Sequence, residues 1–410
     1  MTKKLDQARE HLNRLSAARR SGNGASQPKR GNGSAPPQLP HWSLITHEAI
    51  EQRWEALHAS PGARDELLDP VGLDRAALYQ RNIEHYVGTV RLPLGIAGPL
   101  RVNGSHAKGE YIVPLATTEA ALVASYSRGA QLITASGGAS AMLINEGVSR
   151  SPALLFANLG DLARFLTWLL ANESDVRSAA EATTRFGKLT NLQINVEGNN
   201  LYILMTYGTG DAAGQNMATI ATEAALRWIL ERAPVKPLTA FVEANFSGDK
   251  KASAQSLLGV RGKKVTAEVH VPAELVADVL HTSAERMATY CRIATLGGVM
   301  SGTLGIQGHF ANGLAALFIA CGQDPACVAE AAIGTTRMEL TPEGDLYAAV
   351  TMPNLIVGTV GGGTGLPSQR ACLDLLGLAG PGRARAFAEV AAALCLAGEL
   401  SITGAICAGE

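Results

Sequence analysis

The feature of the sequence that most constrains the fold is a change of pattern after residue 150. Over roughly ninety residues the periodicity then predicts two helices, two strands and a further helix, in that order. The helices lie at about residues 160–172, 174–186 and 217–232, and the strands at 189–196 and 201–206. This order fits a ferredoxin-like unit with an antiparallel sheet. We therefore predict an α+β protein that carries a small inserted domain of this kind.

A loop with two adjacent lysines, residues 242–251 (VEANFSGDKK), follows this unit. Residues 237–242 have the composition of a buried strand, so we expect the loop to leave a sheet edge and to present its charges there. An adjacent lysine pair is usually a solvated surface pair. It can also be an electrophilic site, in which one ammonium stabilises an oxyanion and the other holds an anionic substrate. Taken alone, the loop favours the surface pair.

Two carboxylates lie near predicted helix ends. Glu119 follows a strand and two threonines, and we expect it in the first turn of an alanine-rich helix, where the helix dipole favours a negative charge. Asp324 lies just past the predicted end of another helix, where the dipole opposes a carboxylate. An aspartate placed there needs a cation as its partner, and the lysine loop is the candidate.

Residues 208–217 (GTGDAAGQNM) open the last helix of the small unit. They form either a plain helix cap or a seat for a pyrophosphate on the N–H groups of the helix N-terminus. The glycines do not have the GxGxxG spacing that follows a strand in a βαβ unit, so the sequence does not predict a Rossmann domain.

Composition limits the class of protein. The length of 410 residues suggests two or three domains, and a net charge of −1 gives no basic field that would favour nucleic acid or a membrane. The six cysteines form no CxxC pair, so we expect neither disulfides nor a zinc site. The chain has no apolar signal region at its start and no run of 18 apolar residues. We predict a cytoplasmic protein.

The first forty residues differ from the rest. A charged amphipathic piece is followed by a stretch rich in Gly, Ser, Asn, Pro and Lys, and we expect residues 1–40 to be a disordered leader. Helical patterns then predict an N-terminal helical segment over residues 41–92.

Eight segments together resemble the 3-hydroxy-3-methylglutaryl-coenzyme A reductase family, and the NADPH-using form more than the bacterial NADH-using form. They occur in family order with matching spacing, at residues 92–100, 115–119, 210–217, 249–251, 320–324, 351–353, 358–364 and 396–401. Each segment alone is a weak signal, but eight in order are specific.

The resemblance implies a domain plan and a partner set. Residues 93–151 and 242–410 would form a large acyl-CoA-binding α/β domain, and residues 152–241 a small NADP-binding domain inserted in it. The substrate would be a coenzyme A thioester, the cofactor NADPH, and the assembly a homodimer or a higher homo-oligomer. The resemblance implies no metal.

The resemblance also implies the roles of particular residues. The catalytic glutamate, lysine and aspartate of the family correspond to Glu119, Lys250 and Asp324. The lysine would stabilise the oxyanion that forms when hydride attacks the thioester carbonyl, the glutamate would supply protons, and the aspartate would tune both. Neighbouring charges decide which such group carries the proton. Substrate-binding positions correspond to Arg150, Lys251, His309 and Asn312, and cofactor-binding positions to Thr184, Arg185, Asp211 and Asn216, with Arg185 facing the 2′-phosphate.

Four positions depart from the family pattern. A catalytic histidine is expected nine residues after the 396–401 motif, where this sequence has Glu410. A serine that helps to bind the substrate carboxylate is replaced by Glu243, which would repel that carboxylate if it points inward. A lysine expected before residues 297–300 falls at Ile293, and an arginine expected near the coenzyme A phosphates falls at Met142.

These observations favour one function and leave two alternatives. The first is NADPH-dependent reduction of hydroxymethylglutaryl-CoA to mevalonate, a step of isoprenoid biosynthesis. A specialised reductase of another acyl thioester, which could stop at the aldehyde, would explain Glu243 and Ile293. A catalytically silent homologue that acts as a binding subunit would explain the missing histidine, although Glu119, Lys250 and Asp324 are all retained.

Overall fold

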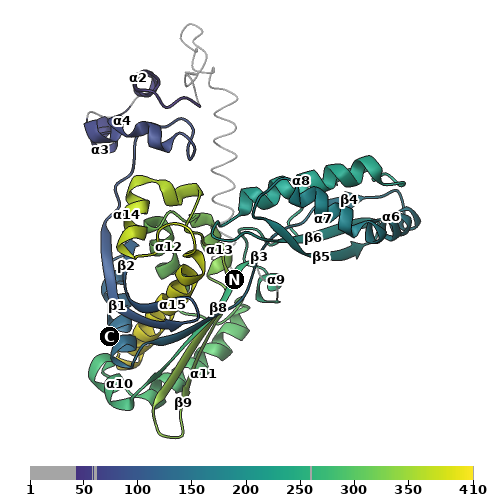
Figure 1. The fold of residues 1–410 in the computed structure, drawn as a ribbon. Helices are drawn as coiled ribbons and strands as arrows, with labels where there is room; N and C mark the ends of the chain where they lie inside the picture. Colours follow the sequence, from purple (N-terminus) through teal and green to yellow (C-terminus); the bar gives the residue numbers. More distant parts are fainter. Residues whose placement is uncertain (1–42, 58, 60–61, 259–260, 410) are drawn as a thin grey trace, which may run out of the picture. The chain divides into compact units, whose positions relative to one another are not determined.

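The structure is a computed structural model that describes residues 43–57, 59, 62–258 and 261–409. It divides into two compact units, Met1–Val90 and Arg91–Glu410, which we describe separately (Figure 1). The predicted leader over residues 1–40 and the terminal Glu410 lie outside the described residues.

The helices of the first unit lie within residues 47–79, whereas residues 80–92 of the predicted helical segment 41–92 form no helix. Its elements are α2 (His47–Ala56), α3 (Ala63–Leu67), α4 (Pro70–Asp74) and the 3-10 helix η1 (Ala76–Tyr79). Thr46 caps α2 by accepting a hydrogen bond from the N–H of Ala49. The Arg53 guanidinium is fully buried and donates to the carbonyl of Tyr86 at 3.0 Å, which satisfies part of its hydrogen-bonding capacity.

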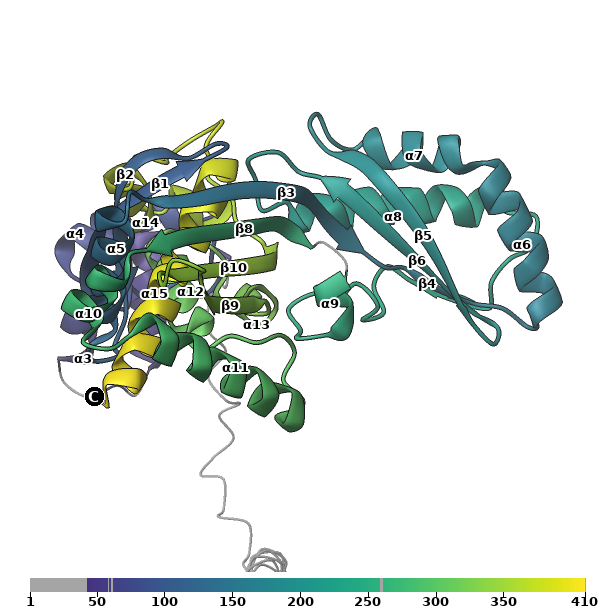
Figure 2. The same ribbon diagram turned by 90° about the horizontal axis from the view of Figure 1, so that it is seen from below.

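The second unit is built on a ten-stranded sheet. The strands of its first part are β1 (Leu94–Gly104), β2 (Lys108–Ala116), β3 (Ala139–Arg150), β8 (Gly262–Val271), β9 (Thr335–Leu340) and β10 (Leu346–Leu355). The sheet also includes β4 (Ala153–Leu155), β5 (Lys188–Glu197), β6 (Asn200–Gly208) and β7 (Thr239–Phe241). The strand order is β7-β4-β6-β3-β8-β10-β9, with β1 beside β2 and β3, and β5 beside β6. β3 is long enough to serve both parts of the sheet, because residues 140–147 pair with β8 and residues 148–150 pair with β6 (Figure 2).

Four of the helices around this sheet pack on a long central helix, α15 (Ala384–Ala408). They are α5 (Leu122–Ala135), α10 (Ala273–Leu280), α11 (Ala284–Ser301) and α12 (Phe310–Ala320). The others are α9 (Ala254–Leu258), α13 (Val328–Ala331), α14 (Pro367–Leu375) and the 3-10 helices η2 (Pro325–Cys327) and η3 (Gly362–Gly365). α15 is the one helix of the described residues that is long and apolar enough to cross a membrane, but 83% of its apolar window is buried inside the fold. It therefore reads as a core helix.

Helices α5 and α15 cross at glycines. A Cβ added to Gly129 would lie 1.9 Å from the carbonyl oxygen of Ala397, so only glycine lets the backbones approach this closely. The ring of Tyr126 fills the space beside Gly398 and Gly313, where an added Cβ would lie 2.4–2.5 Å from ring atoms. The glycines of these helices are thus packing positions.

The rest of the sheet belongs to residues 153–241. Its elements are β4 (Ala153–Leu155), α6 (Leu159–Ala171), α7 (Glu173–Glu181), β5 (Lys188–Glu197), β6 (Asn200–Gly208), α8 (Gln215–Arg232) and β7 (Thr239–Phe241). The strand order is β7-β4-β6-β5 and every pair is antiparallel. The helices and the inner faces of the strands form a hydrophobic core that is distinct from the core around α15.

Two local predictions were wrong. The strand expected to be buried over residues 237–242 is the short edge strand β7, whose neighbour Leu238 and last residue Phe241 are exposed. An apolar composition does not distinguish an edge strand from a buried one. Glu119 does not lie in a first helical turn, because α5 begins at Leu122 after a turn in which Ala121 has φ +62°.

Candidate active site

The lysine loop and Asp324 meet in the structure. The ammonium of Lys250 lies 2.8 Å from Oδ2 of Asp324, so the cation partner expected for this aspartate is present. The hydrogen bond that the Lys250 ammonium donates to Asp324 raises the pKa of Lys250. Partial burial works to raise the pKa of Asp324, but the hydrogen bond and charge of Lys250 outweigh it and the pKa is lowered. The pair is therefore ionised at neutral pH.

The backbone of Lys250 is held by a second carboxylate. Lys250 has φ +55°, a left-handed conformation that is unfavourable for a residue with a Cβ. Its N–H donates to Oε1 of Glu330 at 3.1 Å, and Glu330 has no exposed surface. Glu330 belongs to α13, six residues after Asp324, so one short segment of chain contacts both the backbone and the side chain of Lys250.

A buried cluster of two arginines and two carboxylates surrounds the base of the loop. Arg150 donates to Oδ2 of Asp249 at 2.6 Å and to the hydroxyl of Thr219 at 2.7 Å. Arg261 lies 2.7 Å from Oδ1 of Asp249 and also pairs with Glu330. The charges balance, which buried ions require. Arg150, predicted to bind a substrate carboxylate, is thus already paired with a carboxylate of the chain.

Two other predicted substrate residues flank this cluster. Lys251 is exposed, and its ammonium donates to the carbonyl of Asp249 at 2.9 Å. Glu243 accepts the N–H of Ser151 at 3.1 Å through Oε2, while its Oε1 is buried without a hydrogen bond. Glu243 therefore turns toward the backbone that follows Arg150.

Glu119 belongs to a different group of residues. Both of its oxygens accept from the side-chain amide of Asn312, at 2.9 Å each. His309 lies nearby, and burial lowers the pKa of its imidazole even though the charge of Glu119 acts in the opposite direction. The structure therefore brings together Glu119, His309 and Asn312, three of the predicted site residues.

This second group is fixed by buried side chains of α5 and α15. Glu399 accepts the N–H groups of Gly308 and His309 and the hydroxyl of Thr336. The hydroxyl of Tyr126 donates to the carbonyl of His309 and accepts the N–H of Gly313. Burial raises the pKa of Glu399, and its three donors oppose that shift. The turn that begins α12 is thus held from two sides.

The two groups lie at opposite ends of α12. Asn312 is in its first turn and Asp324 follows its last turn, and an 11-residue helix is about 16 Å long. Among the described residues, no hydrogen bond or ion pair joins Glu119 to Lys250 or Asp324. A single chain therefore keeps Glu119 apart from the other two predicted catalytic residues.

The predicted cofactor residues also fall into two places. Asp211 precedes α8, and its carboxylate accepts the N–H groups of Gly382 and Ala384 at the start of α15. Asn216 is exposed in the first turn of α8. Thr184 and Arg185 lie beyond the end of α7, where the Thr184 hydroxyl accepts the N–H of Gly187 at 3.0 Å and Arg185 is exposed.

Three glycine-containing segments far apart in the sequence meet beside the lysine loop, namely residues 210–217, 320–324 and 358–364. Ala212 bridges Val360, and a Cβ on Gly358 would lie 2.5 Å from the backbone N of Ala213. The side chain of Gln323 joins them, because it accepts the N–H of Gly358 at 2.8 Å and donates to its carbonyl at 3.0 Å. The residues before Asp324 are thereby fixed to the segment that precedes α8.

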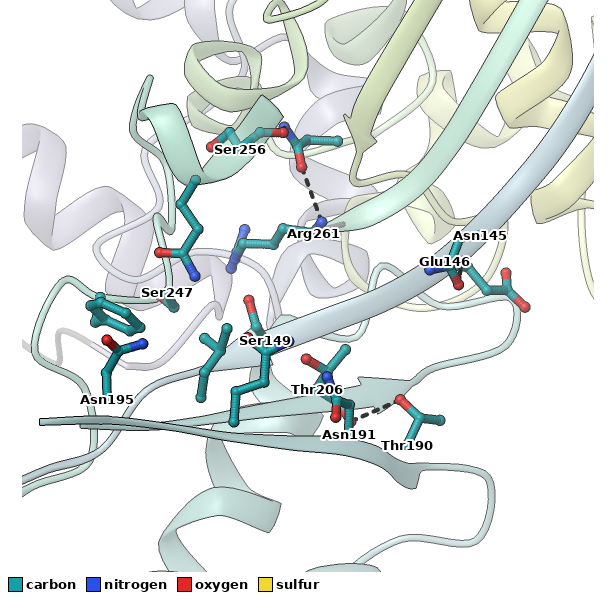
Figure 3. Close-up of a pocket in the computed structure, with 15 residues that line it drawn as sticks. Asn145, Glu146, Ser149, Thr190, Asn191, Asn195, Thr206, Ser247, Ser256 and Arg261 are labelled. Carbon is teal, nitrogen blue, oxygen red and sulfur yellow. Dashed lines mark hydrogen bonds between the residues drawn. The ribbon is translucent and has the colours of Figure 1, made fainter. Parts of the chain in front are cut away.

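A cavity of about 780 Å³ is lined in part by Ser247 of the lysine loop (Figure 3). Asn191, Asn195 and Thr206 line it from β5 and β6, and Ser247, Ser256 and Arg261 line it from the loop side. None of the predicted catalytic, substrate or cofactor residues lines it. Within the described part of the chain, no group of three or more His, Cys, Asp or Glu side chains could hold a metal ion.

Comparison with known proteins identifies the family of this chain. Residues 49–410 match the family model described as hydroxymethylglutaryl-coenzyme A reductase. The chain belongs to this family. A reductase of this name from Methanothermobacter thermautotrophicus is 42% identical over 365 residues, covering 88% of this chain and 91% of the relative. One from Pyrococcus horikoshii is 42% identical over 367 residues, covering 88% and 89%.

Solved structures of the family share the fold. A class II 3-hydroxy-3-methylglutaryl-CoA reductase from Streptococcus pneumoniae, bound to NADPH in open conformations, aligns with a TM-score of 0.66 at 22% identity, covering 88% of this chain and 96% of that one. The α+β class predicted from the sequence agrees with this similarity.

Some residues that shape the site were given no role from the sequence. Arg261 and Glu330 lie outside the motifs of the hydroxymethylglutaryl-coenzyme A reductase family, and Glu399 lies within the 396–401 motif but was not singled out. Glu330 and Glu399 each stand within apolar sequence, and a carboxylate in such a position needs a partner. That signal was present in the sequence, but it does not name the partner.

Proposed function

We propose that this chain reduces hydroxymethylglutaryl-CoA to mevalonate with NADPH as the hydride donor. The observation that carries the proposal is the Lys250–Asp324 ion pair at 2.8 Å, in a chain that belongs to the reductase family over residues 49–410. The name and reported NADPH complex of the Streptococcus pneumoniae relative support the cofactor. The two alternatives, another acyl thioester or a silent homologue, are not favoured by the named relatives.

The proposed chemistry has two hydride transfers. When bound, two NADPH molecules in succession would each supply one hydride: the first would reduce the thioester carbonyl and release coenzyme A as a thiolate, and the second would reduce the resulting aldehyde to the alcohol. Lys250, kept cationic by Asp324, faces the oxygen that becomes negative and stabilises it. Glu119, oriented by Asn312, supplies the proton to the reduced oxygen.

We propose that residues 152–241 form an inserted ferredoxin-like domain. The cofactor would bind to this small domain. The β7-β4-β6-β5 order, the antiparallel pairing and the separate core support this assignment. Arg185, exposed beyond α7, would meet the 2′-phosphate with its planar guanidinium, and Asn216 would lie at the α8 N-terminus, which favours anions. Thr184 and Asp211 complete this proposed set, Asp211 by fixing the turn before α8.

We propose a homodimer in which each reaction centre uses both chains. The separation of Glu119 from Lys250 by the length of α12 supports this, because the two roles need one carbonyl oxygen within reach of both. Helix α11 also exposes Ile293, Leu296, Val299 and Met300, with exposed fractions of 60–88%, and an apolar stripe of this kind suits a subunit contact. A cytoplasmic location remains part of the proposal.

NADPH oxidation with hydroxymethylglutaryl-CoA, with free mevaldehyde and with other acyl-CoA esters tests the function. Wild-type protein should oxidise NADPH with the first two, and Lys250→Ala should lower kcat for both by about 10²–10³-fold, because an oxyanion donor is lost. Lys108→Ala, an exposed lysine of β2, is the matched control and should retain wild-type turnover. Full turnover by Lys250→Ala would remove the role given to this residue.

A further inference from the structure

The left-handed backbone of Lys250 needs a cause outside its own loop. With φ +55° the residue adopts a conformation that is unfavourable for a non-glycine residue, and such conformations persist only where surrounding contacts fix them. Within the loop, the N–H of Lys251 donates to the carbonyl of Gly248 at 3.1 Å, and from outside the loop Oε1 of Glu330 accepts the N–H of Lys250 at 3.1 Å.

Glu330 is held in place by Arg261. Both side chains are almost fully buried, with exposed fractions of 0% and 4%, and they form an ion pair. Burial raises the pKa of Glu330, while the charge of Arg261 and the Lys250 N–H act to lower it. Arg261 also contacts Oδ1 of Asp249 at 2.7 Å, so it ties α13 to the residue that directly precedes Lys250.

The segment from Asp324 to Glu330 therefore contacts the lysine at two points. Asp324 binds the ammonium at 2.8 Å, and Glu330 binds the backbone N–H at 3.1 Å. Because both its backbone and its ammonium are held, Lys250 loses little conformational freedom when the reaction begins. A group that is held in place before the reaction is what electrostatic stabilisation of a transition state requires.

We propose that Glu330, together with Arg261, is a positioning residue for the reduction: it fixes the left-handed backbone of Lys250 and thereby the place of the ammonium beside Asp324. Glu330 touches neither substrate nor cofactor in this proposal and acts only through Lys250. The inference rests on the proposed reductase function.

The test compares Glu330→Met, which has similar length and no acceptor, with Glu330→Gln, which keeps an acceptor oxygen. Glu330→Met should lower kcat about 10–100-fold for both hydroxymethylglutaryl-CoA and mevaldehyde, because small displacements of a catalytic group have effects of this size. The KM for NADPH should stay unchanged, and Glu330→Gln should recover part of the loss. On an Asp324→Asn background the effect of Glu330→Met should shrink, because the ammonium has already lost its partner.

Glu389→Met is the matched control. Glu389 is also fully buried and accepts the N–H groups of His106 and Ala107, far along the chain from the lysine loop. Its loss should lower the melting temperature without changing kcat. The proposal is overturned if Glu330→Met behaves in the same way, with a lower melting temperature and wild-type kcat.

Two further measurements keep the outcome decisive. If Glu330→Met does not fold, Arg261→Lys is measured instead, because a lysine cannot bridge Asp249 and Glu330 as the guanidinium does. Wild-type kcat in Arg261→Lys overturns the proposal. Hydrogen exchange of the Lys250 amide should be slow in wild type and faster in Glu330→Gln and Arg261→Lys. This readout is independent of turnover, so an inactive wild type would contradict the proposed function while the exchange rates still decide the positioning.

Discussion

At the scale of single residues, charge matching dominates the candidate site. Lys250 meets Asp324, Arg150 meets Asp249, and Arg261 meets both Asp249 and Glu330. The Lys250–Asp324 pair has side chains 42% and 37% exposed, so its contribution to the free energy of unfolding is about 1 kcal/mol or less. Its importance lies in the protonation state of Lys250, because only the ammonium stabilises an oxyanion.

Asp324→Asn should move the alkaline limit of activity to lower pH. The pKa of Lys250 is raised mainly by the hydrogen bond that its ammonium donates to Asp324, and burial acts to lower it. Without the aspartate the ammonium is lost at a lower pH as the pH rises, and turnover falls with it. The pH profile of kcat with mevaldehyde measures this. An unchanged alkaline limit would show that another group controls it.

At the scale of elements, α15 organises the large part of the fold. Its N-terminus is capped by Asp211, Glu389 binds the turn between β1 and β2, and Glu399 binds the turn before α12. Each contact joins the helix to a segment distant in sequence. Helix α15 packs closely on α5 at Gly129. The packing of these two helices therefore sets the position of the residues around His309.

Gly129→Ala should destabilise the protein strongly. The added methyl would lie 1.9 Å from the Ala397 carbonyl oxygen, and backbone at that distance cannot yield as a flexible side chain does. Overpacking costs about 1–3 kcal/mol, and more where backbone must move. Thermal or urea unfolding measures it.

Gly297→Ala is the control for this substitution. Gly297 lies within α11, is exposed, and has no atom within 4 Å of an added Cβ, so alanine should be neutral or stabilising by about 0.5–1 kcal/mol. Equal stability of the two variants would contradict the close crossing of α5 and α15.

At the scale of the whole molecule, the separation of the two groups along α12 is the decisive feature. Glu119, His309 and Asn312 lie at its start, and Lys250 and Asp324 lie at its end. A reaction that uses all of them requires either a large rearrangement within one chain or a second chain.

Mixing two impaired variants distinguishes these possibilities. Glu119→Gln and Lys250→Ala should each have strongly reduced turnover, but a mixed dimer holds one reaction centre with both residues intact. Refolding or coexpressing the two together should restore activity to about one quarter of the wild-type value if subunits assort at random. Sedimentation should show a dimer in every sample, and a mixture without activity would place each reaction centre within a single chain.

The sequence by itself determined the α+β class, the family, and the three residues Glu119, Lys250 and Asp324 as candidates, because motif spacing is a local property of the chain. It also anticipated the Lys250–Asp324 pair, since a carboxylate past a helix end needs a cation. It misjudged residues 237–242 and the start of α5, because edge position and a left-handed Ala121 depend on neighbours.

Only the tertiary structure decided which partners these residues have. The contacts of Lys250 with Glu330, of Arg261 with Asp249 and of Glu399 with His309 join positions 80, 12 and 90 residues apart, and sequence periodicity carries no information at such separations. The distance from Glu119 to the lysine loop likewise follows from the length and placement of α12. Burial and charge compensation are properties of the packed molecule, so they appear only when the chain is folded.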